Sequence, residues 1–347
     1  MWVVRAVQIG DLDALDALVQ SATRGLTSLQ LDREQLLDRV EHSVFAFSRT
    51  GMSPRGEPYV LVLVNDETSE LVGTSTIYTK TGGYQPFYAY QLTESFHHSE
   101  LLGVSHTRHS LQLQRIHDGP TEIGSLFLRG VFRRKGIGRW LSLSRFALIA
   151  MLPHRFADRV IAEMRGKADP ETGEVPFWQA VSGRFIPTKF SVVDSMSTVS
   201  KQFIEEMMPM HPIYLDLLPQ EICQGIGTVH NETVPALKLL KSEGFEETDL
   251  VDIFDAGPVV SCPTRKIDGV RRTHEVTVQE ISDDPPTEEP TSILCSRAGG
   301  FTSALADIDP ESGTAKIDGA TAAALQIDIG SSCHAMALRP PVRESRH

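Results

Sequence analysis

One stretch of the chain, residues 122–152, places the tightest limits on the fold. Its first part, residues 123–128, is a short apolar run of the kind that forms a buried strand. Further along, apolar residues recur with the period of a helix, at Ile137, Leu141, Leu148 and Leu152. The sequence therefore predicts a strand that leads directly into a helix.

The turn between this strand and helix combines cationic side chains with glycines. Arg133, Arg134 and Lys135 precede Gly136, and Gly138 follows one residue later. Glycines let the backbone approach a ligand closely, and the first N–H groups of a helix have no partners within the helix. Because the helix end is also positive, the turn predicts a pyrophosphate-binding site.

Two other phosphate-binding motifs do not fit this turn. The dinucleotide motif G-x-G-x-x-G needs a third glycine, but Trp140 and Leu141 follow Gly138, and the P-loop motif G-K-[ST] is absent. The remaining pattern, R-x-x-G-x-G, resembles the acyl-CoA pyrophosphate loop of the GCN5-related N-acyltransferase superfamily. The alternative is that Gly136 and Gly138 only shape a tight turn beside solvated basic residues.

Composition limits the class of protein. A chain of 347 residues suggests two domains, and 41% hydrophobic with 22% charged residues is typical of a soluble globular protein. The formal net charge of -12 argues against a nucleic-acid or membrane-surface role. No apolar run approaches the roughly 20 residues that span a bilayer, and the N-terminus lacks a signal-peptide pattern, so we expect a cytoplasmic protein.

The cysteines are widely spaced and form no C-x-x-C pair or ligand cluster with histidines. We therefore expect free thiols at Cys223, Cys262, Cys295 and Cys333.

The N-terminal half predicts a strand, two helices and a hairpin in that order. Residues 3–7 read as a strand, and Asp11 and Asp32 are the expected caps of the two following helices. Residues 59–64 and 71–79 flank a turn-forming segment and predict an antiparallel pair.

Residues 80–120 are rich in tyrosine, glutamine, glycine and histidine. Metal binding is the less favoured interpretation, because no recognised ligand spacing occurs among His97, His98, His106, His109 and His117. We instead expect an insertion that packs over the mouth of the active site.

A further strand is expected at residues 159–164, at the place where the superfamily has a strand that separates from its neighbour to admit the pantetheine arm. The helix that should follow is delayed to the segment beginning at His230. Residues 165–229 are therefore predicted to be an insertion, with a helix at 197–208.

Several segments, taken in order, narrow the resemblance to one family. They lie at residues 22–29, 164–166, 177–179, 211–214, 230–245 and 252–258. Together they resemble the arginine N-succinyltransferase family, over about residues 3–262. The resemblance implies transfer of a succinyl group from succinyl-CoA to the α-amino group of L-arginine in arginine catabolism. Succinyl-CoA is then a co-substrate, and no permanently bound cofactor or metal is expected.

The resemblance also implies site residues. In the family the histidine of a V-H motif is the proton donor, which here is His230, whereas many superfamily members use a tyrosine at the position of Leu240. His230 as a helix cap is the alternative, although Asn231 is the better cap by residue type. A nucleophilic Cys223 is the rival mechanism.

The donor side of the expected site includes Leu126, Arg133, Gly136 and Gly138. The guanidinium of the acceptor needs a carboxylate, for which Glu122, Glu163, Asp252 and Asp255 are candidates. The succinyl carboxylate needs a cation, for which Arg165 or Arg184 is available.

The C-terminal part changes in composition. Residues 283–290 are acidic and proline-rich, and short strand-like runs follow. We predict an α+β chain: a mixed sheet flanked by helices of the GCN5-related type at residues 1–264, with the insertion at about 165–229, and a small β-rich subdomain at 265–347.

Three interpretations of function stay open. The first is arginine N-succinyltransferase, acting as a homo-oligomer or paired with a homologous subunit. The second is an N-acyltransferase for ornithine, another amine or another acyl-CoA. The third is a non-catalytic CoA-binding subunit. Nucleic-acid and membrane partners are not expected.

Overall fold

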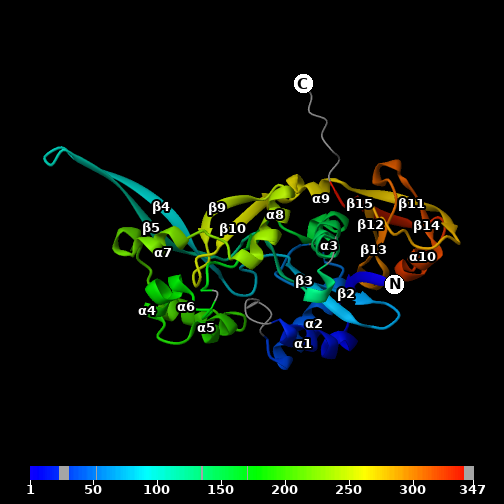
Figure 1. The fold of residues 1–347 in the computed structure, drawn as a ribbon, viewed down its shortest axis with the longest axis horizontal. Coiled ribbons are helices and arrows are strands. Elements are labelled where there is room, and N and C mark those ends of the chain that lie inside the picture. Colours follow the sequence, from blue (N-terminus) through cyan, green and yellow to red (C-terminus); the bar gives the residue numbers. More distant parts are fainter. Residues whose placement is uncertain (23–30, 52, 134–135, 170, 340–347) are drawn as a thin grey trace, which may run out of the picture.

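The computed structural model describes residues 1–22, 31–51, 53–133, 136–169 and 171–339. Within them a single mixed sheet runs along the length of the molecule, with helices on both faces (Figure 1). The strand order is β14-β11-β15-β12-β13-β1-β2-β3-β6-β7-β10-β9-β4-β5-β8. The α+β class expected from the sequence is confirmed.

The N-terminal elements follow the expected order. They are β1 (Trp2–Ala6), α1 (Leu12–Ser21), α2 (Arg33–Ser48), β2 (Pro58–Asn65), β3 (Leu71–Tyr78), β4 (Phe87–Ser99), β5 (Val104–Ile116), β6 (Thr121–Leu128), α3 (Ile137–Met151) and β7 (Arg159–Glu163). The strand predicted at residues 123–128 is thus β6, and the helix predicted from Ile137 onward is α3. The expected hairpin is β2 and β3, which pair antiparallel from Pro58↔Tyr78 to Val64↔Leu71.

The two cap predictions differ in outcome. Asp32 caps α2, because its carboxylate accepts from the Gln35 N–H at 2.9 Å and Gln35 Oε1 accepts from the Asp32 N–H at 3.0 Å. Asp11 stands at the N-cap of α1 but makes no side-chain cap bond there. Its carboxylate instead binds the Arg5 guanidinium at 2.7 and 2.8 Å, which the residue type alone does not reveal.

Alternate residues of the central strands face opposite layers of helices. Val60, Val62 and Val64 of β2 pack with α1 and α2, whereas Leu61 and Leu63 pack with α3. This period of two is the one that a strand imposes on its side chains. The sheet therefore separates an α1/α2 face from an α3 face.

The segment 165–229, predicted to be an insertion, forms mainly short helices that share a hydrophobic core with β4, β5 and residues 251–256. Its described elements include α4 (Gly183–Phe185), α5 (Phe190–Ser197), α6 (Gln202–Met207), β8 (Ile213–Tyr214) and α7 (Gln220–Gly225). The single helix predicted at 197–208 is wrong, because α5 ends before Thr198 and α6 begins after Lys201. Hydroxyl groups compete for backbone carbonyls at this break, where Thr198 Oγ1 donates to the Ser195 carbonyl at 2.7 Å.

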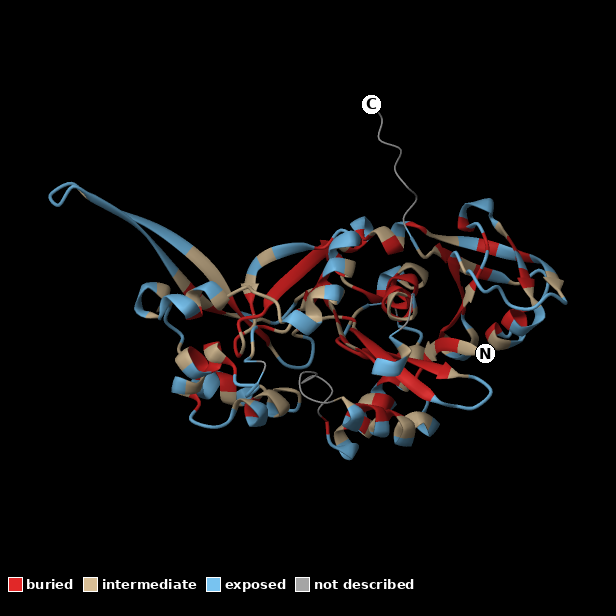
Figure 2. Cartoon of the chain, in the orientation of Figure 1, coloured by how far each residue is buried: buried red, intermediate tan, exposed pale blue. Residues whose placement is uncertain are grey.

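The hairpin of β4 and β5 projects away from the body as a long two-stranded arm (Figure 1). Most of its distal half is exposed (Figure 2). The prediction that residues 80–120 pack over the mouth of the site therefore holds only for the first of them, because Lys80, Gly83, Tyr84 and Tyr88 line the main cavity. The arm carries His97, His98, His106 and His109, away from that cavity.

The remaining elements complete the sheet. They are α8 (Val234–Ser242), β9 (Glu246–Val251), β10 (Pro258–Pro263), α9 (Asp268–Arg271), β11 (Thr273–Ser282), β12 (Ser292–Ser296), β13 (Thr302–Ala306), β14 (Thr314–Asp318), α10 (Gly319–Leu325) and β15 (Ser332–Ala337). The sequence patterns did not predict β11 or α10. Strand β13 pairs with β1 at Val4↔Ser303 and Arg5↔Thr302, so the C-terminal strands extend the N-terminal sheet. The division at residue 264 stays a prediction.

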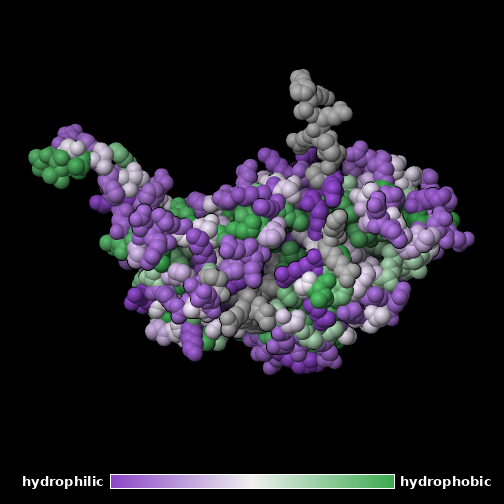
Figure 3. Space-filling view, viewed as in Figure 1, coloured by the Kyte–Doolittle hydropathy of each residue, from purple (hydrophilic) through white to green (hydrophobic). Residues whose placement is uncertain are grey.

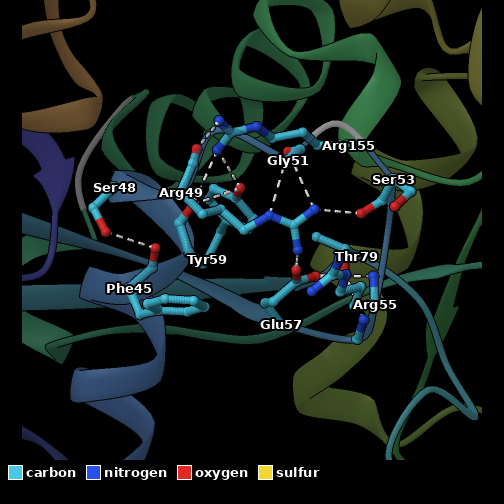
Figure 4. A network of polar contacts seen from close by, with 12 residues as sticks. Phe45, Ser48, Arg49, Gly51, Ser53, Arg55, Glu57, Tyr59, Thr79 and Arg155 are labelled. Carbon is cyan, nitrogen blue, oxygen red and sulfur yellow. Dashed lines mark hydrogen bonds and ion pairs between the residues drawn. The ribbon is translucent and has the colours of Figure 1, made fainter.

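A buried polar network fixes the loop between α2 and β2 (Figure 4). The Glu57 carboxylate accepts from the Thr79 hydroxyl at 2.6 Å and from the Arg55 N–H at 3.0 Å, and it contacts the Arg49 guanidinium. Because Gly56 of this loop and Pro58 at the start of β2 line the main cavity, the network holds one wall of that cavity in place.

A second cation, Arg155, joins the same loop to the segment after α3 (Figure 4). Its guanidinium is buried and donates to the Ala46 carbonyl at 2.9 Å, to the Tyr59 hydroxyl oxygen at 2.7 Å and to the Arg49 carbonyl. Layers on opposite faces of the sheet are thus connected through hydrogen bonds.

None of the helices in the described ranges is both long and apolar enough to cross a membrane.

Candidate active site

A cavity of about 1660 Å³ reaches both faces of the sheet. On one face its lining comes from α2, the foot of the arm and the α5–α6 region. On the other it comes from the turn before α3, from α3 itself and from α8. Strands β6 and β7 lie between these two parts, so their geometry decides how the cavity passes through the sheet.

Strands β6 and β7 pair over only a short distance. They are parallel neighbours at Thr121↔Val160 and Glu122↔Ile161, and no further pairs between them occur along the described strands. Beyond Glu122 the two strands therefore separate, as predicted for the strand at residues 159–164. The opening connects the α3 face with the α1/α2 face.

A β-bulge lies on β6 at the point where the strands separate. Between the pairs Thr76↔Gly124 and Thr74↔Phe127, β6 has one residue more than β3. Ser125 takes a positive φ of 49°, a conformation that is uncommon for residues other than glycine. The bulge turns the backbone at Ser125 and Leu126 out of regular pairing with β3, and both residues line the cavity. The sequence pattern did not predict this bulge.

The predicted phosphate turn lies at the mouth of the α3-face part of the cavity, where Arg133, Gly136 and Gly138 all line it. Gly136 is the N-cap of α3 and has a φ of 89°, which suits glycine. Among the described residues, nothing lies within 4 Å of where a Cβ atom on Gly136 would be. Arg133 Nε donates to the Leu128 carbonyl at 3.1 Å, which ties the turn to β6. Arg134 and Lys135 lie outside the described residues.

Two further arginines of α3 line the cavity and were missed by the sequence reading, Arg139 and Arg145. Arg145 is only 3% exposed, and no acidic side chain lies within 4 Å of its guanidinium in the part of the chain that the structure describes. Burial lowers the pKa of Arg145 to about 9. Gly138, Ser142 and Arg145 stand four and three residues apart on one helix face, a spacing that sequence alone could have revealed.

All four acidic residues proposed from the sequence line the cavity: Glu122, Glu163, Asp252 and Asp255. Residues paired across neighbouring strands point to the same face, so the Glu122↔Ile161 pair places Glu163 on the face of Glu122. The structure thus brings together all the carboxylates proposed from the sequence.

Backbone contacts separate these carboxylates into two kinds. Asp252 accepts from the Phe254 and Asp255 N–H groups, each at 2.7 Å, and Asp255 accepts from the Gly166 and Gly257 N–H groups at 2.8 and 2.7 Å. These two aspartates hold their own loop in place. Glu122 and Glu163 make no such bonds among the described residues.

Burial and like charges raise the pKa values of this cluster. The pKa of Glu163 lies well above the ordinary value, first because of burial and then because of Glu122 and Asp252. Burial also raises the pKa of Glu122, while Lys201 and Arg39 act in the opposite direction. Lys201 and Arg39 both line the cavity and were not singled out from the sequence. A cationic ligand beside Glu122 and Glu163 would favour their charged forms.

His230 stands at the edge of the cavity, beside lining residues rather than among them. Its backbone N–H donates to the Arg165 carbonyl at 2.8 Å, and Arg165 and Glu232, which both line the cavity, lie 3.7 Å apart as an ion pair. The Gly166↔Val229 bridge fixes the same junction.

The prediction that Asn231 caps the late helix is wrong. His230 is the N-cap of the short helix Asn231–Thr233 that leads into α8, and its Nδ1 accepts from the Glu232 N–H at 3.2 Å. The neutral ring therefore carries its proton on Nε2. Burial lowers the pKa of His230, Arg165 lowers it further, and Glu232 opposes the shift. The lowered pKa favours the neutral form of the ring, whose N–H is then on Nε2.

Other residues proposed from the sequence lie elsewhere. Cys223 donates to the Leu215 carbonyl at 3.4 Å, and burial raises the pKa of its thiol, which disfavours a thiolate. Neither Cys223 nor Arg184 lines the cavity. Across the described ranges no three His, Cys, Asp or Glu side chains gather as metal ligands would.

Comparisons with known proteins agree with this geometry. The family described as arginine N-succinyltransferase beta subunit matches residues 2–269. The chain belongs to the arginine N-succinyltransferase family. A family relative of that name from Enterobacter sp. (strain 638) is 38% identical over 296 residues, 85% of each chain. Another of the same name, from Salmonella newport (strain SL254), is 36% identical over 332 residues, 95% of this chain and 96% of the relative.

One solved structure is similar to this chain over almost its whole length. The structure of arginine/ornithine succinyltransferase subunit AI from Pseudomonas aeruginosa superposes with a TM-score of 0.87 at 28% identity, over 98% of this chain and 99% of that one. The arm, the insertion and the C-terminal strands thus fall within the matched length.

Proposed function

We propose that the chain transfers the succinyl group of succinyl-CoA to the α-amino group of L-arginine, giving CoA and N2-succinyl-L-arginine. The observation that carries the proposal is the two-sided cavity. A phosphate-binding turn lies on the α3 face, two carboxylates without backbone partners lie on the α1/α2 face, and the gap between β6 and β7 joins them.

On the donor side, the turn of Arg133, Gly136 and Gly138 binds the pyrophosphate of the acyl-CoA. Arg139 and Arg145 supply further positive charge along α3. The pantetheine arm then follows the bulge of β6, where the backbone around Ser125 and Leu126 receives the thioester. Donors fixed beside a thioester carbonyl stabilise the negative charge that develops on its oxygen.

On the acceptor side, Glu122 and Glu163 bind the guanidinium of arginine, since Asp252 and Asp255 already accept bonds from the backbone. Asp252 contributes to the negative potential. Arg165, at the junction with His230, binds the carboxylate of the succinyl group. The two substrates are held at once, so the reaction is a direct transfer with no acyl-enzyme.

The chemical step needs two proton transfers. The substrate ammonium loses a proton, its nitrogen attacks the thioester carbonyl, and the tetrahedral intermediate expels the CoA thiolate. His230 takes up one proton lost by the amine and, as the imidazolium, donates the Nε2 proton to that thiolate; the second proton lost by the amine is set free, so one proton is released for each turnover.

A second acceptor, ornithine, is favoured by one observation. The Pseudomonas aeruginosa structure is described as an arginine/ornithine succinyltransferase subunit. An ammonium in place of a guanidinium would also be neutralised by Glu122 and Glu163. The proposed location is the cytoplasm, which suits a protein whose four cysteines are all free thiols.

The deciding assay follows CoA release as free thiol from purified protein. Succinyl-CoA or acetyl-CoA is supplied with arginine, ornithine, lysine or no amine. We expect the highest kcat/KM for succinyl-CoA with arginine. Higher turnover with ornithine than with arginine would show that ornithine is the preferred acceptor. Tight binding of CoA without any release of free thiol would indicate a non-catalytic subunit.

His230→Ala tests the proton donor, with the exposed His154→Ala as matched control. We expect the first to lower kcat by roughly 10²- to 10⁴-fold and the second to leave it unchanged. Equal affinities of both variants for CoA would show that the loss lies in chemistry. Wild-type turnover in His230→Ala would remove the histidine from the mechanism.

A further inference from the structure

A largely buried ion cluster joins the first turn of α3 to the end of α8 and to the C-terminal strands. Arg139 Nη2 donates to Glu243 Oε1 at 3.1 Å, and Arg272 Nη2 donates to the same oxygen at 2.7 Å. Arg139 Nε also donates to the Leu338 carbonyl at 2.7 Å. Arg272 Nε donates to the Ala337 carbonyl at 2.8 Å. Two consecutive carbonyls at the end of β15 therefore hold the two guanidinium groups beside one carboxylate.

Arg139 is the member of this cluster that reaches the main cavity. It lines that cavity, whereas Arg272 and Glu243, whose side chain is 0% exposed, are not among the lining residues. Arg139 lies one helical turn after Gly136, and residues three apart are neighbours on a helix surface. The guanidinium is thus fixed by groups outside the cavity, at the same end of α3 as the phosphate turn.

The part of the cavity between α3 and α8 gives an acyl-CoA a direction. Before α8, Glu232 and Thr233 line the cavity beside His230. At the other end of α8, Leu240 lines it close to Glu243. With the thioester at the His230 end, the nucleotide of the acyl-CoA lies towards Glu243 and Arg139.

Positive charge is in excess around Arg139. In the part of the chain that the structure describes, Glu243 is the one acidic side chain within 4 Å of either guanidinium group of the cluster. Burial lowers the pKa of Arg139, Glu243 opposes this shift, and Arg272 and the exposed Arg339 lower the pKa further. Figure 3 shows strongly hydrophilic surface over the α3 region, below the C-terminus. Three cations near one carboxylate leave positive charge for an anionic ligand.

A phosphate monoester suits this excess of positive charge. It carries a charge of about −1.5 to −2 at pH 7, and the planar guanidinium of arginine matches the geometry of its oxygens. CoA has such a monoester on the 3′ oxygen of its ribose, and the same ribose is joined to the pyrophosphate. A side chain next to the pyrophosphate-binding turn is therefore placed to reach it.

We propose that Arg139 binds the 3′-phosphate of the acyl-CoA and that Glu243 is the positioning residue that orients the Arg139 guanidinium. The proposal rests on the proposed function for the identity of the donor, but not on the acceptor or on the transfer step. It also gives the C-terminal part of the chain a role in the site, since Arg272 and the Leu338 carbonyl help to hold this pair.

Calorimetric titration of the full chain with CoA and with 3′-dephospho-CoA tests the proposal without any acyl transfer. We expect the unaltered protein to bind CoA more tightly by about 10-fold or more. Arg139→Met should remove this difference by weakening the binding of CoA alone. Arg271→Met removes a 60% exposed cation next to Arg272 in sequence and is the matched control, which should change neither affinity.

Three results would contradict the proposal in different ways. Equal affinities of the unaltered protein for the two ligands would overturn it, whatever the variants do. An equal loss for both ligands in Arg139→Met would overturn it as well, because the guanidinium would then contact a part that the ligands share. Binding of neither ligand would remove the acyl-CoA donor, and with it the proposed function.

Variants of Glu243 test its role as a positioning residue. Glu243→Ala should lower the ratio of the two affinities, because the guanidinium of Arg139 loses its acceptor. Glu243→Gln should keep the ratio, because an amide oxygen can still accept from both arginines. Urea unfolding shows whether each variant is folded. An unchanged ratio in folded Glu243→Ala, or a ratio lost in folded Glu243→Gln, would show that the Glu243 carboxylate does not act by orienting Arg139.

Discussion

The guanidinium of Arg145 is held by Ser142 of its own helix: Nε donates to the Ser142 carbonyl at 3.1 Å, and Nη2 donates to the Ser142 hydroxyl oxygen at 2.6 Å. These bonds orient the cation without neutralising it. A buried guanidinium that lines the cavity without a carboxylate is prepared for an anion that arrives with a ligand.

Replacing Arg145 by methionine should therefore weaken binding of CoA at least 10-fold, as measured by isothermal titration calorimetry. The folded protein should lose little or no stability, because an uncompensated buried charge is removed along with its two local bonds. Arg145→Lys keeps the charge but loses the planar guanidinium. Its affinity for CoA should lie between those of the unaltered protein and of Arg145→Met. Unchanged CoA affinity in Arg145→Met would show that the anion binds elsewhere.

Substitution of alanine for each glycine of the phosphate turn should affect the stability of the fold differently. Gly136 has a left-handed backbone, so Gly136→Ala should lower the free energy of unfolding by about 1–2 kcal/mol. Gly138 lies inside α3, and a Cβ there would make only an ordinary contact with Leu128 at 3.8 Å. Gly138→Ala should thus keep or slightly raise stability. Urea unfolding of the two variants compares these effects, and equal losses would contradict the assignment.

Glu163→Gln should change how stability depends on pH. The folded protein raises the pKa of Glu163, so this group stabilises the fold below its unfolded value, near 4.5, and that contribution is lost as pH rises through the folded pKa. The variant should therefore gain stability relative to the unaltered protein as pH rises from about 5 to 8. Urea unfolding at both pH values measures the difference.

The exposed Glu311→Gln is the control and should show no such trend. The same Glu163→Gln variant should raise the KM for arginine, because the guanidinium loses one opposing charge. A constant difference in unfolding free energy at both pH values would mean that Glu163 titrates normally.

Arg155→Met should destabilise the fold by about 2–4 kcal/mol, because it leaves the Ala46 carbonyl and the Tyr59 hydroxyl without this buried donor. Arg33→Met, which removes an exposed ion pair with Asp13, should cost far less stability, because solvent screens an exposed pair. Denaturant unfolding checks both changes. Similar losses would show that the network of Figure 4 contributes little.

Local patterns were enough to predict the central part of the fold. The apolar run before Leu128 and the helical period after Ile137 predicted β6 and α3, and the family resemblance implied the separation of β7 from β6. The predictions of β6 and α3 follow from residues close together in sequence. The extent of the arm did not, because alternating polar residues on an exposed ribbon lack the apolar face that marks a buried strand.

The sequence predicted only part of the candidate site. Residue type placed Glu122 and Glu163 among four equivalent carboxylates, and only the backbone bonds of Asp252 and Asp255 distinguish the pairs. The cap at His230 was only the less favoured alternative because an imidazole is an unusual cap, and the position of His230 depends on its N–H bond to the Arg165 carbonyl at a distant strand end. Arg39 and Lys201 reach the cavity only through tertiary packing.

The pairing of β1 with β13 has a consequence for synthesis of the chain. Val4 is synthesised 299 residues before its partner Ser303, so the two strands cannot pair until that whole intervening segment has been made. Until then one edge of β1 lacks a neighbour and presents open backbone groups to other nascent chains. Folding of this sheet is therefore completed only after Ser303 has been made, and slow non-local closure makes the growing chain dependent on protection from aggregation.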